Sequence, residues 1–194
     1  MSIQQRPKYK QIIDAAVKVI AENGFHRSQV SKIAKRAGVA DGTIYIYFKN
    51  KEDILVSLFK EKMGQFVEKI EAEIKEKKDA KEKLLTMVKV HFDQLAADYP
   101  LAIVTQLELR QSETEIRMAI NNVLKKYLHV IDGILEEGKQ QGVFRDAIDI
   151  RLARQMIFGT LDETVTNWVM NDHKYELRDL ADPVGDLLVN GLSR

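Results

Sequence analysis

Apolar residues recur at intervals of three and four positions through most of the chain, the spacing that one buried face of an α-helix requires. No segment shows the strict alternation that is typical of a half-buried strand. The pattern predicts an all-α fold of nine helices, three in an N-terminal head and six in a body. The predicted helices cover about residues 7–23, 29–37, 41–48, 52–77, 81–97, 101–111, 114–141, 150–171 and 177–192.

Turn and cap residues mark several of the predicted boundaries. Gly24 and Gly38 follow the last turns of the first two helices, where a left-handed backbone conformation is common. Ser28 is a candidate N-cap of the second helix and Asp149 of the eighth, because their side-chain oxygens can accept from free backbone N–H groups. Gly142 is expected to end the long seventh helix.

Residues 30–48 have the pattern of a helix-turn-helix motif, two short helices joined by a tight glycine turn. Ala34 is small where the two helices approach each other most closely. On a helical wheel, Ile44 and Phe48 lie on the buried side of the second of these helices. The positions left facing outward are Gly42, Thr43, Tyr45 and Ile46, with Tyr47 at the flank.

Charge divides the chain into a basic N-terminal quarter and an acidic remainder. Residues 1–51 contain ten basic and three acidic residues, a net charge of +7, whereas the whole chain carries +1 and the remainder therefore −6. This asymmetry is typical of a polyanion-binding head on a module with a different task. An uneven but fully solvated surface is the alternative that charge alone leaves open.

Composition narrows the class of protein further. Hydrophobic residues make up 45% of the chain and charged residues 30%, as in ordinary folded proteins. The absence of cysteine excludes disulfides and thiolate chemistry and fits a reducing cytoplasm, which is the expected location. The sequence has neither a signal-peptide pattern nor an uninterrupted apolar run of membrane-spanning length, so no membrane partner is expected.

The outward positions of the third helix carry chemistry suited to a DNA duplex. The hydroxyls of Thr43 and Tyr47 suit phosphate oxygens, and Gly42 lets the backbone approach a partner closely. The apolar side chains of Tyr45 and Ile46 can contact thymine methyl groups in a major groove. Lys49 and Lys51, just beyond the helix, can bind phosphates.

The stretch IIDAAVKVIAENGFHRSQVSKIAKRAGVADGTIYIYFKNKEDIL resembles the N-terminal DNA-binding domain of the TetR family of bacterial repressors. The shared features include the AGV turn, GTIY, YF and KEDIL. One departure is Ala40, where many members have a serine that caps the recognition helix; Asp41 can replace part of that cap through the helix dipole. The resemblance implies a head of residues 1–51, with further DNA contacts around the start of the second helix. Those residues are Ser28, Gln29, Ser31 and Lys32.

The body, residues 52–194, resembles a narrower group within this family. LAIVTQLELRQS, GILEEGKQQG and RLARQMIFGTLDETVTNWVM are similar to the Bacillus-type fatty-acid-degradation repressors, the FadR type. The resemblance implies a repressor of β-oxidation genes that long-chain acyl-coenzyme A (acyl-CoA) releases from a palindromic operator. It implies no cofactor besides this effector. A repressor of the same fold that responds to another hydrophobic effector, such as a drug, is the alternative.

An acyl chain requires an apolar tunnel, and the phosphates of coenzyme A require basic groups near its mouth. The body offers apolar and aromatic residues for the tunnel, although each is also consistent with simple core packing. It offers arginines for the mouth, although surface pairing with carboxylates explains them equally well. The candidates are Phe66, Ile70, Val88, Phe92, Val104, Leu107, Arg110, Tyr127, Arg151, Arg154, Met156 and Trp168.

The resemblance also implies a homodimer. The last two helices of two subunits are expected to form a four-helix interface that buries Ile157, Leu161, Leu187 and Leu188. Two-fold symmetry then requires an inverted-repeat operator whose half-sites lie in successive major grooves. Effector binding in the body is expected to shift the long helix over residues 52–77 and so to change the distance between the two heads.

No catalytic or metal site is expected. The four histidines show no metal-ligand spacing, and satisfied core or surface histidines are the simpler interpretation. Asp162 and Glu163 point to different faces of one helix, which disfavours an acid/base pair. An enzyme with a helix-turn-helix appendage is the alternative class, and no nucleophile–base set in the sequence supports it. The histidines are His26, His91, His129 and His173.

Overall fold

A computed structural model describes residues 7–193, which form nine α-helices and one 3₁₀ helix, η2. The all-α fold predicted from the apolar spacing is confirmed. These residues form two compact units, described separately below. The first unit ends at Lys62 and also contains Pro100–Asn121; the second contains Met63–Tyr99 and the residues from Asn122 onward. The predicted division between residues 51 and 52 stays a prediction, and residues 1–6 and 194 lie outside the described residues.

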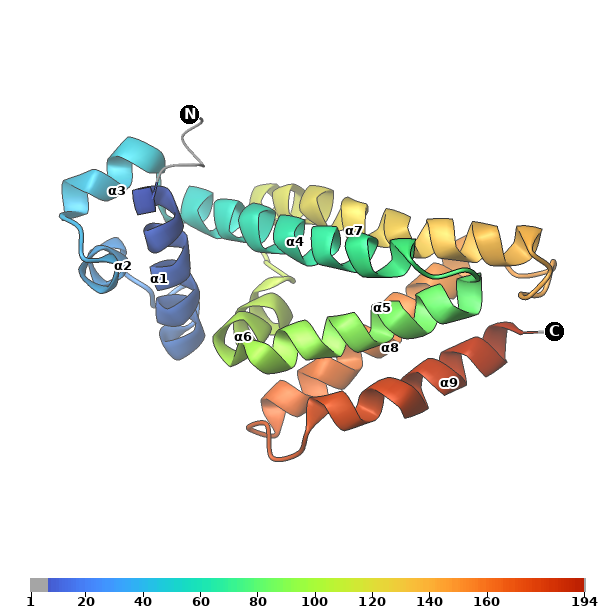
Figure 1. Cartoon of the computed structure of the whole chain (residues 1–194). Coiled ribbons are helices and arrows are strands. Elements are labelled where there is room, and N and C mark those ends of the chain that lie inside the picture. Colours follow the sequence, from blue (N-terminus) through green and yellow to red (C-terminus); the bar gives the residue numbers. More distant parts are fainter. Residues whose placement is uncertain (1–6, 194) are drawn as a thin grey trace. The chain divides into compact units, whose positions relative to one another are not determined.

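The first unit contains a cluster of three short helices, drawn from blue to cyan in Figure 1. These are α1 (Pro7–Asn23), α2 (Val30–Ala37) and α3 (Asp41–Tyr47). The unit also contains the start of α4 (Lys51–Lys75), most of α6 (Tyr99–Glu108) and the start of α7 (Thr114–Gln140). Its core is the continuous apolar stripe that the sequence predicted, with Ile12, Ile33 and Ile44 almost completely buried.

Glycines end the first two helices as predicted. Gly24 has a φ of 73° and Gly38 a φ of 66°, both in the left-handed region that residues with a Cβ rarely adopt. The N–H groups of Gly38 and Val39 donate back to carbonyls of the last turn of α2. This closure sets the turn between α2 and α3, so the two helices of the motif are held in a fixed relation.

The prediction that Ser28 caps α2 is wrong. The N-cap is Gln29, which makes no side-chain cap bond. Ser28 is buried, and its hydroxyl donates to the carbonyl oxygens of Gly24 at 2.8 Å and Val19 at 3.3 Å. The serine satisfies carbonyls at the end of α1 instead, because the turn folds its side chain back onto that helix.

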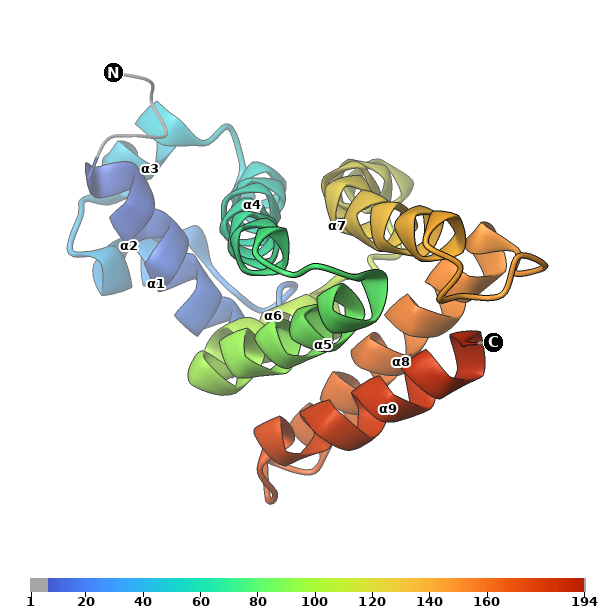
Figure 2. The ribbon, with the colours of Figure 1, turned by 45° about the vertical axis from the view of Figure 1, so that its right-hand side comes forward.

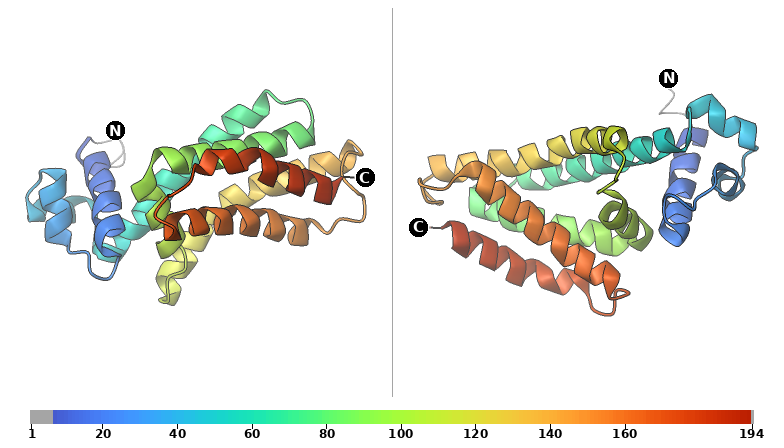
Figure 3. Two further views of the ribbon diagram at one scale, coloured as in Figure 1. Left: turned by 90° about the horizontal axis from the view of Figure 1, so that it is seen from below. Right: turned by 180° about the vertical axis from the view of Figure 1, so that it is seen from behind.

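The second unit is a helical bundle (Figures 2 and 3). It contains α5 (Ala80–Ala97), α8 (Ile150–Met170), η2 (Leu177–Leu180) and α9 (Ala181–Leu192), together with the remaining turns of α4 and α7. Figure 2 shows α9 running beside α5 and α8. The final predicted helix therefore consists of two elements, since η2 precedes α9.

Carboxylate caps define two helix starts in this unit. Asp79 accepts from the backbone N–H of Glu82 at the start of α5, and the Glu82 carboxylate accepts in return from the N–H of Lys78. The arrangement differs from a capping box in that Glu82 accepts from the residue before the N-cap and not from the N-cap itself. At the start of α8, Asp149 accepts from the N–H of Leu152 at 3.0 Å, which confirms the predicted cap.

Candidate nucleic-acid interface and effector-binding residues

The exposed face of α3 is the main candidate for DNA contact. Tyr45 is 59% and Ile46 64% exposed, whereas Ile44 and Phe48 are buried. This is the division that the helical wheel predicted. A large aromatic and a large aliphatic side chain next to each other in solvent have no packing role within the unit, so they are free to contact a partner.

Aromatic packing holds α3 in place. Phe48 stacks on Tyr9 of α1, with 5.1 Å between the ring centroids, and Tyr47 lies at 6.3 Å from the same ring. Tyr47 and Thr43 are half-buried at the edges of the exposed face. The N-cap of α3 is Ala40, without a side-chain cap bond, and Asp41 stands exposed in the first turn. The apolar face of α3 is therefore presented from a rigid support.

The start of α2 supplies a second group of candidate residues. Gln29, Ser31 and Lys32 are exposed, as contact with DNA requires, whereas Ser28 is buried and turned toward α1. Lys32 lies 3.4 Å from the side-chain oxygen of Asn23. On the same helix, Arg36 Nη2 lies 2.8 Å from both carboxylate oxygens of Glu22, so part of the positive charge counted in this segment is paired within the unit.

The two lysines after α3 differ in their surroundings. Lys49 is exposed, whereas the Lys51 ammonium donates to the carbonyl oxygens of Phe25 and His26, each at 3.1 Å, and lies 4.5 Å from the centroid of the Phe25 ring. Lys51 thus satisfies carbonyls in the turn between α1 and α2. We therefore expect the phosphate contact at Lys49 and a structural role for Lys51.

This pair allows a matched test. Lys49→Ala should flatten the dependence of log K for DNA on log salt by about one unit per head, because one counterion release is lost. Lys51→Ala should leave this slope unchanged and lower the melting temperature, because two carbonyls lose their donor. DNA binding titrated at several salt concentrations and thermal unfolding measure both effects. A flattened slope in Lys51→Ala with unchanged melting would contradict the structural role.

Glu108 connects the end of α6 to the same turn, a contact that no local sequence pattern predicts. Its carboxylate accepts from the backbone N–H of Phe25 at 2.9 Å and from the side chain of Gln111 at 2.6 Å. Phe25 and Glu108 are 83 positions apart in the sequence, so no local spacing relates them. The turn between α1 and α2 is thereby held by two charged side chains, Lys51 and Glu108.

The apolar candidates for an effector tunnel lie mostly in buried positions. In the second unit, Phe66, Ile70, Val88 and Phe92 are buried, and Phe66 lies 6.1 Å from the ring of Tyr127. Trp168 is also buried there, and its indole N–H donates to the carbonyl of Tyr175 at 2.8 Å. In the first unit, Val104 is buried and Leu107 is exposed. Their contact with an effector stays a prediction.

The basic candidates and Met156 have diverse positions. Arg110 is exposed after α6 in the first unit, and Arg151 is exposed at the start of α8 in the second. Arg154 donates to the Asp132 carboxylate at 2.7 Å in a partly buried ion pair. Met156 is exposed on α8 and lines a groove beside α9. Met156 thus lies on the outer side of α8 in the isolated chain.

A buried polar pair in the second unit was not recognised as a site from the sequence. His91 of α5 and Tyr127 of α7 lie 2.8 Å apart, from Nδ1 to the phenol oxygen, and both side chains are buried. Burial lowers the pKa of His91 to about 3, so the imidazole is neutral. Burial, followed by the charge of Asp162, raises the pKa of Tyr127. The available signal was a histidine on the apolar stripe of the fifth predicted helix.

The lowered pKa of His91 predicts a specific loss of stability in acid. The unfolded chain binds a proton on His91 below about pH 6.5 and the folded chain does not until about pH 3, so acid favours unfolding between these values. Relative to His91→Gln, the wild-type unfolding constant should rise by up to about tenfold for each unit by which the pH is lowered in this window. Urea unfolding at pH 7 to 4 measures it. Equal pH slopes for the two proteins would contradict a neutral buried imidazole.

The residues that the structure describes include neither a metal-binding cluster nor a membrane-spanning helix. Residues 7–193 contain no group of three or more histidine, cysteine or carboxylate side chains that could hold a metal ion. None of the helices in this part of the chain combines the length and the apolar composition needed to cross a membrane. Asp162 is buried and Glu163 exposed, as expected for two neighbours that face opposite sides of a helix.

The fold and the exposed face of α3 define a helix-turn-helix DNA-binding regulator. Residues 12–58 match the family described as bacterial regulatory proteins, tetR family, and residues 59–191 match the YsiA-like protein C-terminal region of TetR regulators. The chain belongs to the TetR family of transcriptional regulators.

Individual relatives are similar over nearly the whole chain. The fatty acid metabolism regulator protein of Bacillus subtilis is 68% identical over 189 residues, which are 97% of both chains. The crystal structure of the B. subtilis regulator FadR in complex with stearoyl-CoA has a TM-score of 0.92 at 68% identity, covering 95% of this chain and 99% of that one. FadR of Bacillus halodurans has the same TM-score and coverage at 65% identity.

Proposed function

We propose that this chain is a homodimeric repressor of fatty-acid-degradation genes that long-chain acyl-CoA releases from a palindromic operator. The observation that carries the proposal is the 68% identity, over nearly full length, to a regulator crystallised with stearoyl-CoA. The exposed pair Tyr45 and Ile46 supports the DNA-binding half of this function. Residues 1–51 act as the DNA-binding head and 52–194 as the effector-binding and dimerisation body. Acting on DNA, the protein works in the cytoplasm.

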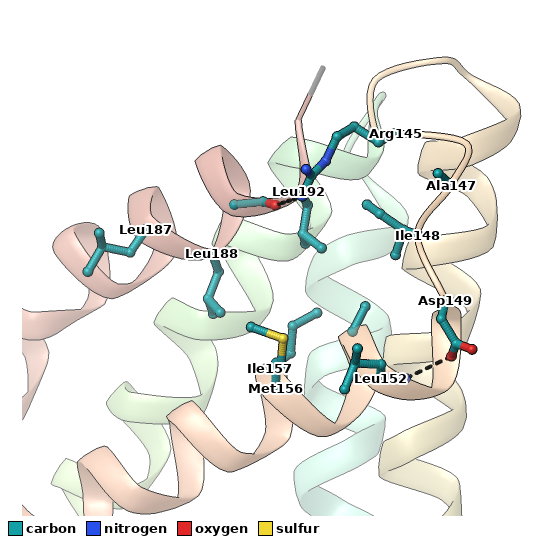
Figure 4. Close-up of a pocket in the computed structure, with 12 residues that line it drawn as sticks. Arg145, Ala147, Ile148, Asp149, Leu152, Met156, Ile157, Leu187, Leu188 and Leu192 are labelled. Carbon is teal, nitrogen blue, oxygen red and sulfur yellow. Dashed lines mark hydrogen bonds between the residues drawn. The ribbon is translucent and has the colours of Figure 1, made fainter.

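The surface of α8 and α9 supports a dimer. A groove of about 380 Å³ between these helices is lined mainly by apolar side chains (Figure 4). Leu188 points from α9 toward α8, and Leu152, Met156 and Leu187 are exposed around the groove. A second copy of the chain covers such a surface in a two-fold arrangement, in which each α8 and α9 meets the same pair of the partner.

The predicted interface set is wrong for two residues. Ile157 and Leu161 are already fully buried within the single chain, so they are not available to a partner. Leu187 is 75% exposed and Leu188 half-buried, which keeps both in the proposed interface. Leu152 and Met156 take the places of the two excluded residues, because they are exposed on the same helix beside the groove.

The dimer determines the form of the operator. Two heads related by a two-fold axis require an inverted repeat with half-site centres about one helical turn of DNA apart, or a multiple of it. In this proposal acyl-CoA binds in the body and shifts α4, which runs through both units. The shift changes the distance between the two heads. The effector releases DNA only to the extent that it binds the shifted state more tightly than the DNA-bound state.

Release of operator DNA tests the proposal. Stearoyl-CoA should dissociate a fluorescent inverted-repeat duplex from the protein in a polarisation titration, and stearate and free coenzyme A should not at the same concentration. The operator is first selected from random duplexes. If stearate is as effective as stearoyl-CoA, or if only a drug-like cation releases the duplex, the effector assignment is wrong while the TetR-type repressor remains.

A further inference from the structure

The second unit contains a polar atom that its own fold leaves unsatisfied. His91 Nε2 is buried and has no hydrogen-bond partner among residues 7–193. The other ring nitrogen, Nδ1, pairs with the Tyr127 hydroxyl at 2.8 Å. The ring lies among aromatic side chains, edge-on to Phe66 at 5.2 Å and to Phe92 at 5.7 Å between centroids. The free nitrogen is therefore enclosed in apolar surroundings.

If His91 only filled space in the core, its unsatisfied Nε2 would lower the stability of the fold. A buried N–H or lone pair without a partner costs about 1–3 kcal/mol relative to a satisfied one. A leucine at this position would continue the stripe of Val88, Phe92 and Leu95 without that penalty. A histidine here is explained if a polar atom of a bound molecule meets Nε2.

The direction of the Tyr127 contact decides the chemistry of that atom, because either the phenol or the imidazole can donate. When the Tyr127 O–H donates to Nδ1, the single ring proton of the neutral imidazole resides on Nε2. Nε2–H is then a donor directed into apolar surroundings, and the matching ligand atom is an acceptor. Asp162, which is buried on α8 and close enough to influence Tyr127, adds negative charge to the neighbourhood. A neutral acceptor fits such a place better than a carboxylate does.

We propose that His91 Nε2–H binds the carbonyl oxygen of an acyl thioester, and that Tyr127 is the positioning residue that keeps the proton on Nε2. The inference rests on the proposed function and adds the group that recognises the reacting end of the effector. A thioester carbonyl is the polar atom nearest the acyl chain and carries no charge. A free fatty acid would have to bury its carboxylate among apolar side chains and near the charge of Asp162. The cost of desolvating that carboxylate excludes the free acid.

A pair of ligands that differ only at the carbonyl tests the proposal. Stearoyl-CoA and S-octadecyl-CoA, a thioether with a methylene group in place of the carbonyl, are titrated calorimetrically into wild type, His91→Leu and His91→Gln. Wild type should prefer the thioester by about fivefold to thirtyfold, the value of one buried hydrogen bond. His91→Leu should lose this preference, and His91→Gln should keep part of it because its amide retains a donor. Tyr127→Phe should reduce the preference, since the proton is no longer confined to Nε2.

The ratio of the two affinities separates recognition from structure. If His91 has only a structural role, its substitution should weaken the binding of both ligands equally and leave the ratio unchanged. This result would overturn the proposal. Thermal unfolding and operator binding without effector check the fold of each variant; if His91→Leu does not fold, the ratios of His91→Gln and Tyr127→Phe decide. If wild type binds neither coenzyme A ligand, the proposed effector is wrong and this inference fails with it. A wild-type ratio near one defeats this inference alone.

Discussion

Tyr45→Ala is expected to weaken operator binding by roughly 30- to 1,000-fold without unfolding the protein. Tyr45 is 59% exposed on α3, so removing its ring leaves the buried core of the first unit intact. The loss of its contacts to base edges costs about 1–2 kcal/mol per head, and a dimer loses it twice, so the total is about 2–4 kcal/mol. Fluorescence polarisation with the selected operator measures the effect.

Met118→Ala is the matched control for this substitution. Met118 is 60% exposed on α7 in the same unit, but it lies outside α2 and α3. Its removal deletes a similar exposed apolar side chain and should leave the affinity for DNA unchanged. Wild-type affinity in Tyr45→Ala, or an equal loss in both variants, would remove Tyr45 from the reading face.

Leu187→Glu is expected to raise the dissociation constant of the dimer by about 100-fold or more, and operator affinity should fall with it. Leu187 is 75% exposed in the single chain, so the substitution leaves the monomer intact. In a two-fold interface the new carboxylate occurs twice, and the burial of each without a partner costs several kcal/mol. Analytical ultracentrifugation measures the dimer, and the same polarisation assay measures DNA binding.

Two further variants make this test sharper. Met156→Glu places the charge on α8, on the other side of the groove, and should have the same effect. Met118→Glu adds a charge at an exposed methionine of the first unit and should leave the dimer unchanged. A dimer of wild-type stability in both Leu187→Glu and Met156→Glu would place the interface elsewhere.

The candidate DNA interface was largely predictable from the sequence. Ile44 and Phe48 face inward and Tyr45 and Ile46 outward because residues within one helix are related by a fixed rotation. The glycine turns were predictable for a similar local reason, since Gly38 has a backbone conformation that few other residues adopt. Only the residues whose side chains fold back into the unit, Ser28 and Lys51, could not be assigned in this way.

The effector candidates and the dimer surface were much less predictable. The spacing of apolar residues on the eighth helix fits two overlapping stripes, one through Ile157 and Leu161 and the other through Leu152 and Met156. Which stripe is covered within the chain depends on the packing of α8 in the second unit, and the sequence of one helix does not specify its neighbours. The same limit applies to the buried polar residues of this unit.

The sequence by itself determined the all-α fold, the helix-turn-helix, the basic head and the outward face of α3. These follow from interactions between residues a few positions apart, whose geometry the helix fixes. Only the tertiary structure decided that Lys51 and Glu108 hold the turn at Phe25, and that His91 meets Tyr127 with one nitrogen and leaves the other free. The physical reason is that these partners stand 26, 83 and 36 positions apart, and only chain folding brings such residues within hydrogen-bond distance.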